Sequence, residues 1–431
     1  MLFYTNTDSS YMCGAKEIMS NTNLGGSGLF NRNILSSSFI LVTNSFSWYF
    51  PLYIFFTNAL NKFEIAYVDL LMILGFHYIT ILIFAFISTA IVGKLVSSDR
   101  LLSIWGLLGT TFSAFMIFLG SNNLLGVYFV SFLIGVALGF GFPNCLARFA
   151  NSVSMENIGK FSGVALSISL LGMFLVGFLT NILSFIEAVL VFTVWRAIGI
   201  IAFQVTKRKE RCRGKRDVID VSFKYIISEK AFVLYVIPWT MFCLVNFFEL
   251  PLQQFHWGAE ASNMVSTVEF GIASITAAIG GYFADIIGRK RLVILGYVFL
   301  GMGYALLSIS PTNPIPIAIY TVLDGFAWGL FATIFFLIIW SDLAGNKVKD
   351  KYYLLGTLPF LLSSYLSVMV SPLVKVIDLS VSFSLASFFL FLAVVPLMFA
   401  PETLPEKTLR ERELRSYIER AKRVREKFTK G

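Results

Sequence analysis

Residues 281–292 read Gly281-Tyr282-Phe283-Ala284-Asp285-Ile286-Ile287-Gly288-Arg289-Lys290-Arg291-Leu292. This segment joins two long apolar runs, and it places an acid, a glycine and three consecutive cations in one short turn. Gly288 allows the backbone to reverse tightly, because glycine accepts conformations that other residues avoid. Three cations in a short loop between apolar runs are typical of the cytoplasmic side of a membrane protein.

The composition of the whole chain also indicates a membrane protein. Of its 431 residues, 57% are hydrophobic and only 14% are charged, whereas a soluble domain has about 25% charged residues. Each apolar segment is near the roughly 20 residues that cross a bilayer as a helix. We predict twelve spans, at 35–58, 66–92, 101–120, 124–147, 161–181, 183–204, 231–252, 263–287, 292–309, 315–340, 353–374 and 380–399.

The placement of the cations predicts the orientation of these spans. The net charge of +9 would suit a nucleic-acid-binding protein, but nearly all Lys and Arg side chains fall in the two tails and in alternate loops. The exceptions are Lys62 and Lys375 on the other side and Arg196 within a span. Basic residues collect in cytoplasmic loops, so we expect both termini in the cytoplasm, a plasma-membrane location and no nucleic-acid partner.

An internal repeat divides the spans into two sets of six. Residues 133–139 (Leu-Ile-Gly-Val-Ala-Leu-Gly) recur 190 positions later as residues 323–329 (Leu-Asp-Gly-Phe-Ala-Trp-Gly). Paired repeats with a site between them are common in secondary transporters. We expect Gly135, Gly139, Gly325 and Gly329 to let helices pack closely. The predicted parts are a disordered cytoplasmic N-tail (1–34), a six-helix bundle (35–204), a basic linker (205–230), a second bundle (231–399) and a basic tail (400–431).

The C-terminal tail has helical periodicity. Leu414, Ile418, Ala421, Val424 and Phe428 recur on one side of such a helix, and cations and acids alternate between them. A basic amphipathic helix lying on the anionic inner leaflet would have this pattern. A solvated charged helix fits it equally well.

The segment 281–292 resembles the loop signature of the major facilitator superfamily, and Pro401-Glu402-Thr403 after the last span is similar to many of its members. The resemblance implies an all-α membrane protein with twelve transmembrane helices in two pseudo-symmetric six-helix halves. It implies a secondary active transporter that moves a small solute by alternating access. It also implies that Asp285 and Arg289 form a charge network that clamps the cytoplasmic ends of the two halves.

Two departures from that family's pattern affect the expected mechanism. Ser97 and Ser98 stand where the first-half copy of the loop would carry its acid and glycine, which predicts a gate that holds on one side only. Ser131 stands where many members carry an arginine that accompanies proton coupling. Its absence weakens the case for a proton-driven mechanism.

Acids within spans are the remaining candidates for function, because a charge at the centre of a membrane helix costs about 2.5–3.5 kcal/mol. Asp324 lies near the middle of the tenth span and Glu269 lies in the eighth; His77, in the second, is a weaker candidate. Our hypothesis is a proton or substrate site. The alternative is a structural acid bonded to a neighbouring helix. We expect Glu249 at the outer rim and Arg196 to extend its side chain toward the inner surface.

Other kinds of site find no support in the sequence. Cys13, Cys145, Cys212 and Cys243 are scattered and only two His occur, which indicates neither a disulfide framework nor a metal site. No phosphate-binding loop is present, so we expect no cofactor. A transport-inactive sensor and a uniporter without proton coupling remain as alternative functions. A polytopic enzyme would need converging His, Cys or Ser side chains, which the sequence does not indicate.

Overall fold

The computed structural model describes residues 32–62, 65–92, 96–121, 123–207 and 219–404, together with Leu414, Tyr417 and Ile418. Within these ranges the regular structure is helical, apart from two isolated bridges. The predicted N-tail up to residue 31, the middle of the basic linker and nearly all of the C-terminal tail lie outside the described residues.

The first half of the chain forms six spans, two of which are divided. Its helices are α2 (Arg32–Lys62), α3 (Tyr67–Ile91), α4 (Ser98–Phe115) with η1 (Met116–Ser121), α5 (Leu124–Gly139) with α6 (Phe142–Ser152), α7 (Ile158–Ile182) and α8 (Phe185–Lys207). The short helix α9 (Phe223–Ser228) belongs to the linker.

The second half has the same plan. Its helices are α10 (Lys230–Trp257), α11 (Ala259–Ala284), α12 (Arg289–Ile309), α13 (Pro314–Phe331) with η2 (Ala332–Ile338) and α14 (Ile339–Ala344), α15 (Lys349–Val370) with η3 (Ser371–Leu373), and α16 (Leu379–Leu392) with α17 (Val394–Phe399). Twelve helices in the described residues are long and apolar enough to cross a membrane, one at each predicted position. The chain is therefore a multi-pass membrane protein, as predicted.

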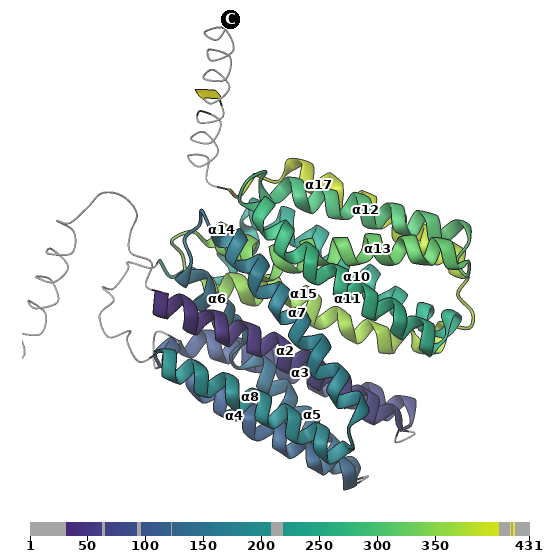
Figure 1. Cartoon of the computed structure of the whole chain (residues 1–431), viewed down its shortest axis with the longest axis horizontal. Helices are drawn as coiled ribbons and strands as arrows, with labels where there is room; N and C mark the ends of the chain where they lie inside the picture. Colours follow the sequence, from purple (N-terminus) through teal and green to yellow (C-terminus); the bar gives the residue numbers. More distant parts are fainter. Residues whose placement is uncertain are drawn as a thin grey trace, which may run out of the picture.

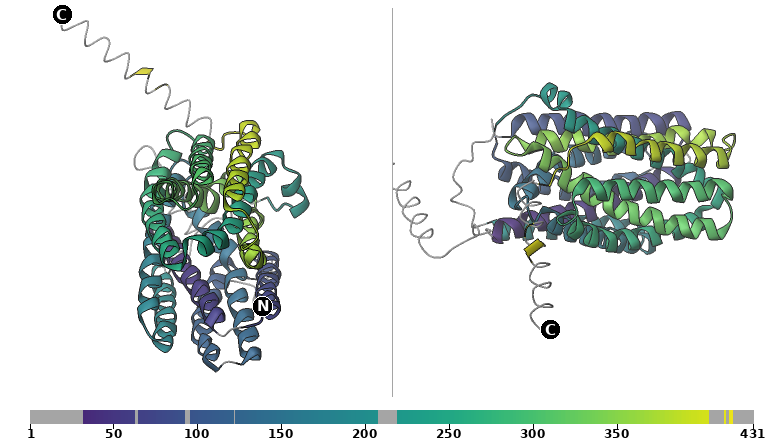
Figure 2. Two further views of the ribbon diagram at one scale, coloured as in Figure 1. Left: turned by 90° about the vertical axis from the view of Figure 1, so that its right-hand side faces the viewer. Right: turned by 90° about the horizontal axis from the view of Figure 1, so that it is seen from above.

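The two halves lie side by side with their helices roughly parallel (Figures 1 and 2). In Figure 1 the purple and blue helices of the first half lie below the green and yellow helices of the second. The start of α2 and the end of α17 lie at the same end of the bundle. We call this end, which carries the Asp285–Arg289 loop, the basic side, and the other end the opposite side.

The repeat in the sequence is also a repeat in the packing. A Cβ added to Gly139 would lie 2.4 Å from the backbone oxygen of Ile81, and one added to Gly329 would lie 2.6 Å from that of Ala273. The second span therefore packs closely against the fourth, as the eighth does against the tenth. Gly135 and Gly325 make similarly close contacts with His77 and Glu269 backbone oxygens.

The fourth and tenth spans are irregular at equivalent positions. The helix of the fourth span breaks between α5 and α6, and Pro143 lies in the first turn of α6, where a missing backbone N–H is tolerated. The tenth span changes to a π-helix at Ala332, 190 residues after Phe142. Both irregularities therefore lie in the part of the span nearer the basic side.

Candidate functional site

The loop after α11 joins the two halves through a carboxylate. Asp285 Oδ1 accepts from the backbone N–H of Gly159 at 2.9 Å, and Oδ2 accepts from that of Lys160 at 2.9 Å. Both amides belong to the first turn of α7, where N–H groups lack helical partners and the helix dipole favours an anion. An acid of the second half therefore caps a helix of the first.

Small residues bring the two backbones close enough for this contact. A Cβ on Gly159 would lie 2.4 Å from the backbone oxygen of Gly281, and a Cβ on Gly281 would lie 2.4 Å from that of Gly159. Gly163 approaches Gly281 and Ala277 in the same way. Closely packed glycines are a usual means of joining membrane helices, so the cap depends on the packing of α7 against α11.

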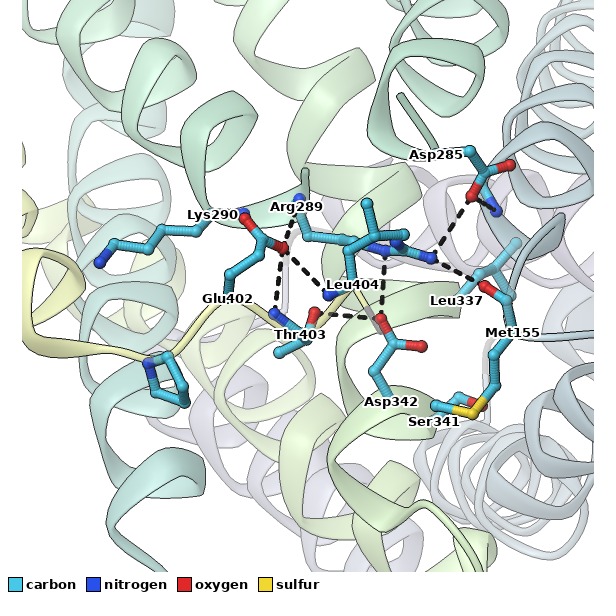
Figure 3. Close-up of polar contacts among 12 residues, drawn as sticks. Met155, Asp285, Arg289, Lys290, Leu337, Ser341, Asp342, Glu402, Thr403 and Leu404 are labelled. Atoms are coloured by element: carbon cyan, nitrogen blue, oxygen red, sulfur yellow. Dashed lines mark hydrogen bonds and ion pairs between the residues drawn. The ribbon is translucent and has the colours of Figure 1, made fainter. Parts of the chain in front are cut away.

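Arg289 connects this cap to the tenth span (Figure 3). Its guanidinium is fully buried; Nη2 donates to Asp285 Oδ1 at 3.3 Å and to the backbone oxygen of Met155 at 3.0 Å. Nε lies 3.1 Å from Asp342 Oδ2 in an ion pair whose two side chains are both buried. One cation thus holds two acids of its own half and a carbonyl of the other half. We call Asp285, Arg289 and Asp342 with the start of α7 the latch.

The segment after the last span, which includes Glu402 and Thr403, bonds two members of the latch, Arg289 and Asp342. Glu402 accepts from the backbone N–H groups of Arg289 at 2.8 Å and Lys290 at 3.2 Å, which caps α12. Thr403 Oγ1 donates to Asp342 Oδ2 at 3.0 Å (Figure 3). Gly288 has a φ of 109°, and a Cβ there would lie 2.4 Å from Glu402 Oε2. The sequence pattern pointed to this Pro-Glu-Thr segment as a family feature but did not reveal its contact with Asp342.

The remaining cations of the loop are peripheral. Lys290 Nζ donates to the backbone oxygens of Met398 at 2.9 Å and Ala400 at 2.8 Å, and Arg291 is exposed.

The pKa of the Asp285 carboxyl is raised above its usual range, and burial is the largest cause. The two amides and Arg289 oppose this rise, because they favour the ionised form.

The first half has an ion pair of its own with the two charges exchanged. Asp99, in the first turn of α4, pairs with Arg148 near the end of α6, whereas in the second half Arg289 starts α12 and Asp342 is in α14. Lys349 Nζ donates to the backbone oxygen of Ala150 at 3.2 Å and to Ser341 Oγ at 2.8 Å. A lysine therefore joins the halves near the first-half ion pair. The degenerate first-half loop, with Ser97 and Ser98, had led us to expect no gate contact there.

Asp324 and Glu269 lie together inside the second half. Their helices pack closely here, since a Cβ on Gly325 would lie 2.9 Å from the backbone oxygen of Glu269, and Asp324 Oδ2 accepts from the Tyr320 hydroxyl at 2.9 Å. Gln253 Nε2 in turn donates to the Tyr320 oxygen at 3.1 Å. Only 4% of Asp324 is exposed. Two acids close together in a buried site disfavour the state in which both are ionised, because like charges repel there.

Glu249 lies in the interior of the second half rather than at an exposed rim. It is 2% exposed, and its Oε1 accepts from Ser382 Oγ at 2.7 Å. The prediction was wrong because α10 continues to Trp257, eight residues beyond Glu249, so that the acid is not at the end of the helix.

His77 is separate from the two acids. Its Nδ1 lies 3.1 Å from the backbone oxygen of Ser131 and its Nε2 lies 3.2 Å from the Tyr49 hydroxyl, both in the first half. The carbonyl only accepts, so Nδ1 carries the proton and Tyr49 donates to Nε2. Ser131 Oγ donates to the backbone oxygen of Ile73 at 2.9 Å. These contacts satisfy a neutral imidazole in the packing of α3 against α5.

Two hollows lie toward the opposite side of the second half. A small one of about 20 Å³ is lined by Gln253, Ser262 and Asn263, among others. A larger, open one of about 410 Å³ is lined by His256, Lys375 and others, and includes neither member of the carboxyl pair. Among the described residues, no group of three or more His, Cys, Asp or Glu side chains is arranged to hold a metal ion.

Two solved structures with a similar architecture are transporters of the major facilitator superfamily. The proton:xylose symporter XylE, bound to 6-bromo-6-deoxy-D-glucose, superimposes with a TM-score of 0.64 at 12% identity, over 87% of this chain and 97% of that one. FucP in its outward conformation gives a TM-score of 0.63 at 14% identity, over 86% and 98%. No protein-family model and no curated protein sequence matches the chain. The chain therefore has the fold of these transporters, as the signature loop predicted.

Proposed function

We propose that this chain, which has the fold of the major facilitator superfamily, is a secondary transporter that moves a small solute by alternating access. The latch supports this proposal. Its contacts join the two packed halves at the basic side, and they are polar contacts that can be released and remade. The buried pair with Asp342 fixes the position of Arg289, which bonds the Met155 carbonyl of the other half, because a buried charge left without its partner is costly.

We further propose that transport is coupled to protons through Asp324 and Glu269. The observation that carries this step is the close approach of the two acids inside the second half. A Cβ on Gly325 would lie 2.9 Å from the backbone oxygen of Glu269, and the adjacent Asp324 is only 4% exposed. Gln253 and Tyr320 form a bonded chain from the pair toward the opposite side. The 20 Å³ hollow beside Gln253 has room for one water. A proton would reach the pair along this chain.

We propose that the protein lies in the plasma membrane with its basic side facing the cytoplasm. This orientation rests on the distribution of cations between alternate loops. The basic tail after residue 404 would then lie near the anionic inner leaflet, which attracts such segments. The tail itself is almost entirely outside the described residues.

Infrared difference spectroscopy between acidic and alkaline buffer tests the proton site. We expect the purified wild-type protein to show a protonated-carboxyl band that is lost or displaced in both Asp324→Asn and Glu269→Gln. Asp378→Asn is the matched control, because Asp378 is an exposed acid that caps α16 in the same half. If no such band titrates in the wild type, proton coupling at this pair is wrong and a uniporter is favoured.

A further inference from the structure

The surface along which the halves meet in the middle of the bundle is aromatic. Phe360 of α15 is central to it. Its ring centroid lies within 6.1 Å of five others, those of Phe50 (6.0 Å), Trp239 (6.1 Å), Phe247 (5.4 Å), Trp328 (6.0 Å) and Phe336 (5.0 Å). Phe50 belongs to the first half, and its neighbour on the same helix face, Phe46, meets Phe336 at 5.5 Å. Rings from both halves therefore pack against each other at this depth.

A row of hydroxyl groups follows, one helical turn nearer the opposite side. Ser364 Oγ of the second half donates to the Tyr78 oxygen of the first at 2.7 Å, and the hydroxyls of Tyr53 and Tyr78 lie 2.6 Å apart. Tyr365 donates to the backbone oxygen of Leu71 at 2.8 Å. Phe50, Tyr53 and Ser364 are partly exposed. The interface thus combines apolar rings with neutral hydrogen-bonding groups.

Away from the basic side, the charged groups buried within the spans bond inside their own halves. Arg196 donates to Asn44 and Ser45 of the first half. In the second half Asp324 accepts from Tyr320 and Glu249 accepts from Ser382. A charged solute in a water-poor site needs an opposite charge to compensate for lost hydration. The contacts that join the halves at mid-depth include no ion pair among the described residues.

If the halves rock as proposed, these are the contacts that separate and meet the solute. We propose that the solute is uncharged and has an aromatic or similarly flat apolar face next to a hydroxyl group. The rings around Phe360 would stack on its flat face. The hydroxyls of Tyr53, Tyr78 and Ser364 would bond its polar group, as a few placed polar groups do in apolar ligand sites. The inference rests on the proposed transport function.

Four probes of matched chemistry test the solute class in calorimetric titrations of the full chain in lipid nanodiscs. Tyrosol, tyramine and 4-hydroxyphenylacetate share a hydroxyphenyl ring and a two-carbon side chain, and are neutral, cationic and anionic respectively. D-Xylose is neutral but has no aromatic face. We expect saturable binding of tyrosol, with the other three at least tenfold weaker.

Two substitutions locate the binding. Ser364→Ala and Tyr78→Phe each remove one hydroxyl from the interface, and we expect each to weaken tyrosol binding at least threefold. Ser384→Ala is the control, because Ser384 is exposed on α16 and donates to Ser380 of its own helix. Equal affinity in Ser364→Ala, Tyr78→Phe and the wild type would overturn the assignment.

The other outcomes are equally decisive. Tighter binding of tyramine, 4-hydroxyphenylacetate or D-xylose than of tyrosol would overturn the solute class, and so would a failure of all four to bind. Movement of the two halves, followed by spin labels without any solute, tests the transport function separately. Halves that exchange between states without binding tyrosol would disprove only the solute class.

Discussion

Arg289 is the residue at which contacts within the second half and contacts between the halves meet. Its fully buried guanidinium holds Asp285, Asp342 and the carbonyl of Met155. Asp285 and Asp342 both have Arg289 as their cationic partner. Loss of Arg289 would therefore leave two buried carboxylates without this counter-charge, which is strongly disfavoured. The latch should therefore tolerate removal of a whole pair better than removal of one member.

A double-mutant cycle on the Arg289–Asp342 pair tests this dependence. We expect Arg289→Met to lower the unfolding free energy by about 3–5 kcal/mol, the usual cost of breaking a buried pair. Arg289→Met combined with Asp342→Leu should lose less than the sum of the two single variants. Unfolding in detergent micelles gives all four values. Additive losses would show that the two side chains do not act as a pair.

Asp285 and Arg196 show which side-chain contacts can be predicted from the sequence and which cannot. The contact between Asp285 and Arg289 was implied by the family resemblance, since both residues lie within the quoted loop. Arg196 was expected to extend to the inner surface, but it is fully buried, with its guanidinium 4.4 Å from the ring centres of both Trp48 and Trp105. Those rings come from α2 and α4, more than ninety residues earlier, so no local pattern reveals the contact.

Among the elements, the paired second and fourth spans and the paired eighth and tenth spans are held by glycines. The positions were predictable because the glycines recur in both halves of the repeat. The breaks in the fourth and tenth spans do not follow from the repeat. Hydropathy records how apolar a run is and not whether its helix is α or π, and residues 332–338 are apolar apart from Thr333.

Glycine substitutions on α11 and α13 measure this packing. We expect Gly329→Ala to destabilise the protein by about 1–3 kcal/mol, since a new Cβ would collide with Ala273 and Thr276. Gly271→Ala on the partner helix is the control, because nothing lies within 4 Å of its added Cβ. That change should be neutral or stabilising by up to about 1 kcal/mol, the gain in helix propensity. Equal thermal shifts for both variants would contradict the packing argument.

At the scale of the whole molecule, two six-helix halves are joined differently at their two ends. On the basic side the capped helix α7 and the bond from Arg289 to the Met155 carbonyl join them; toward the opposite side, hydroxyl contacts between α3 and α15 do so. Hydropathy, cation placement and the repeat predicted the number and grouping of the spans. Which side chains cross between the halves depends on helix rotation and tilt, which these signals do not contain.

The distance between the halves on the basic side tests the latch most directly. Spin labels at Glu156 and Arg291, both exposed and on different halves, would report it in a background without the four cysteines. Asp285→Asn should shift the distance distribution to longer values, since the amide cannot accept from both N–H groups of α7. Asp378→Asn, which alters a helix cap within one half, should leave it unchanged. A distribution in Asp285→Asn identical to that of the wild type would contradict the account.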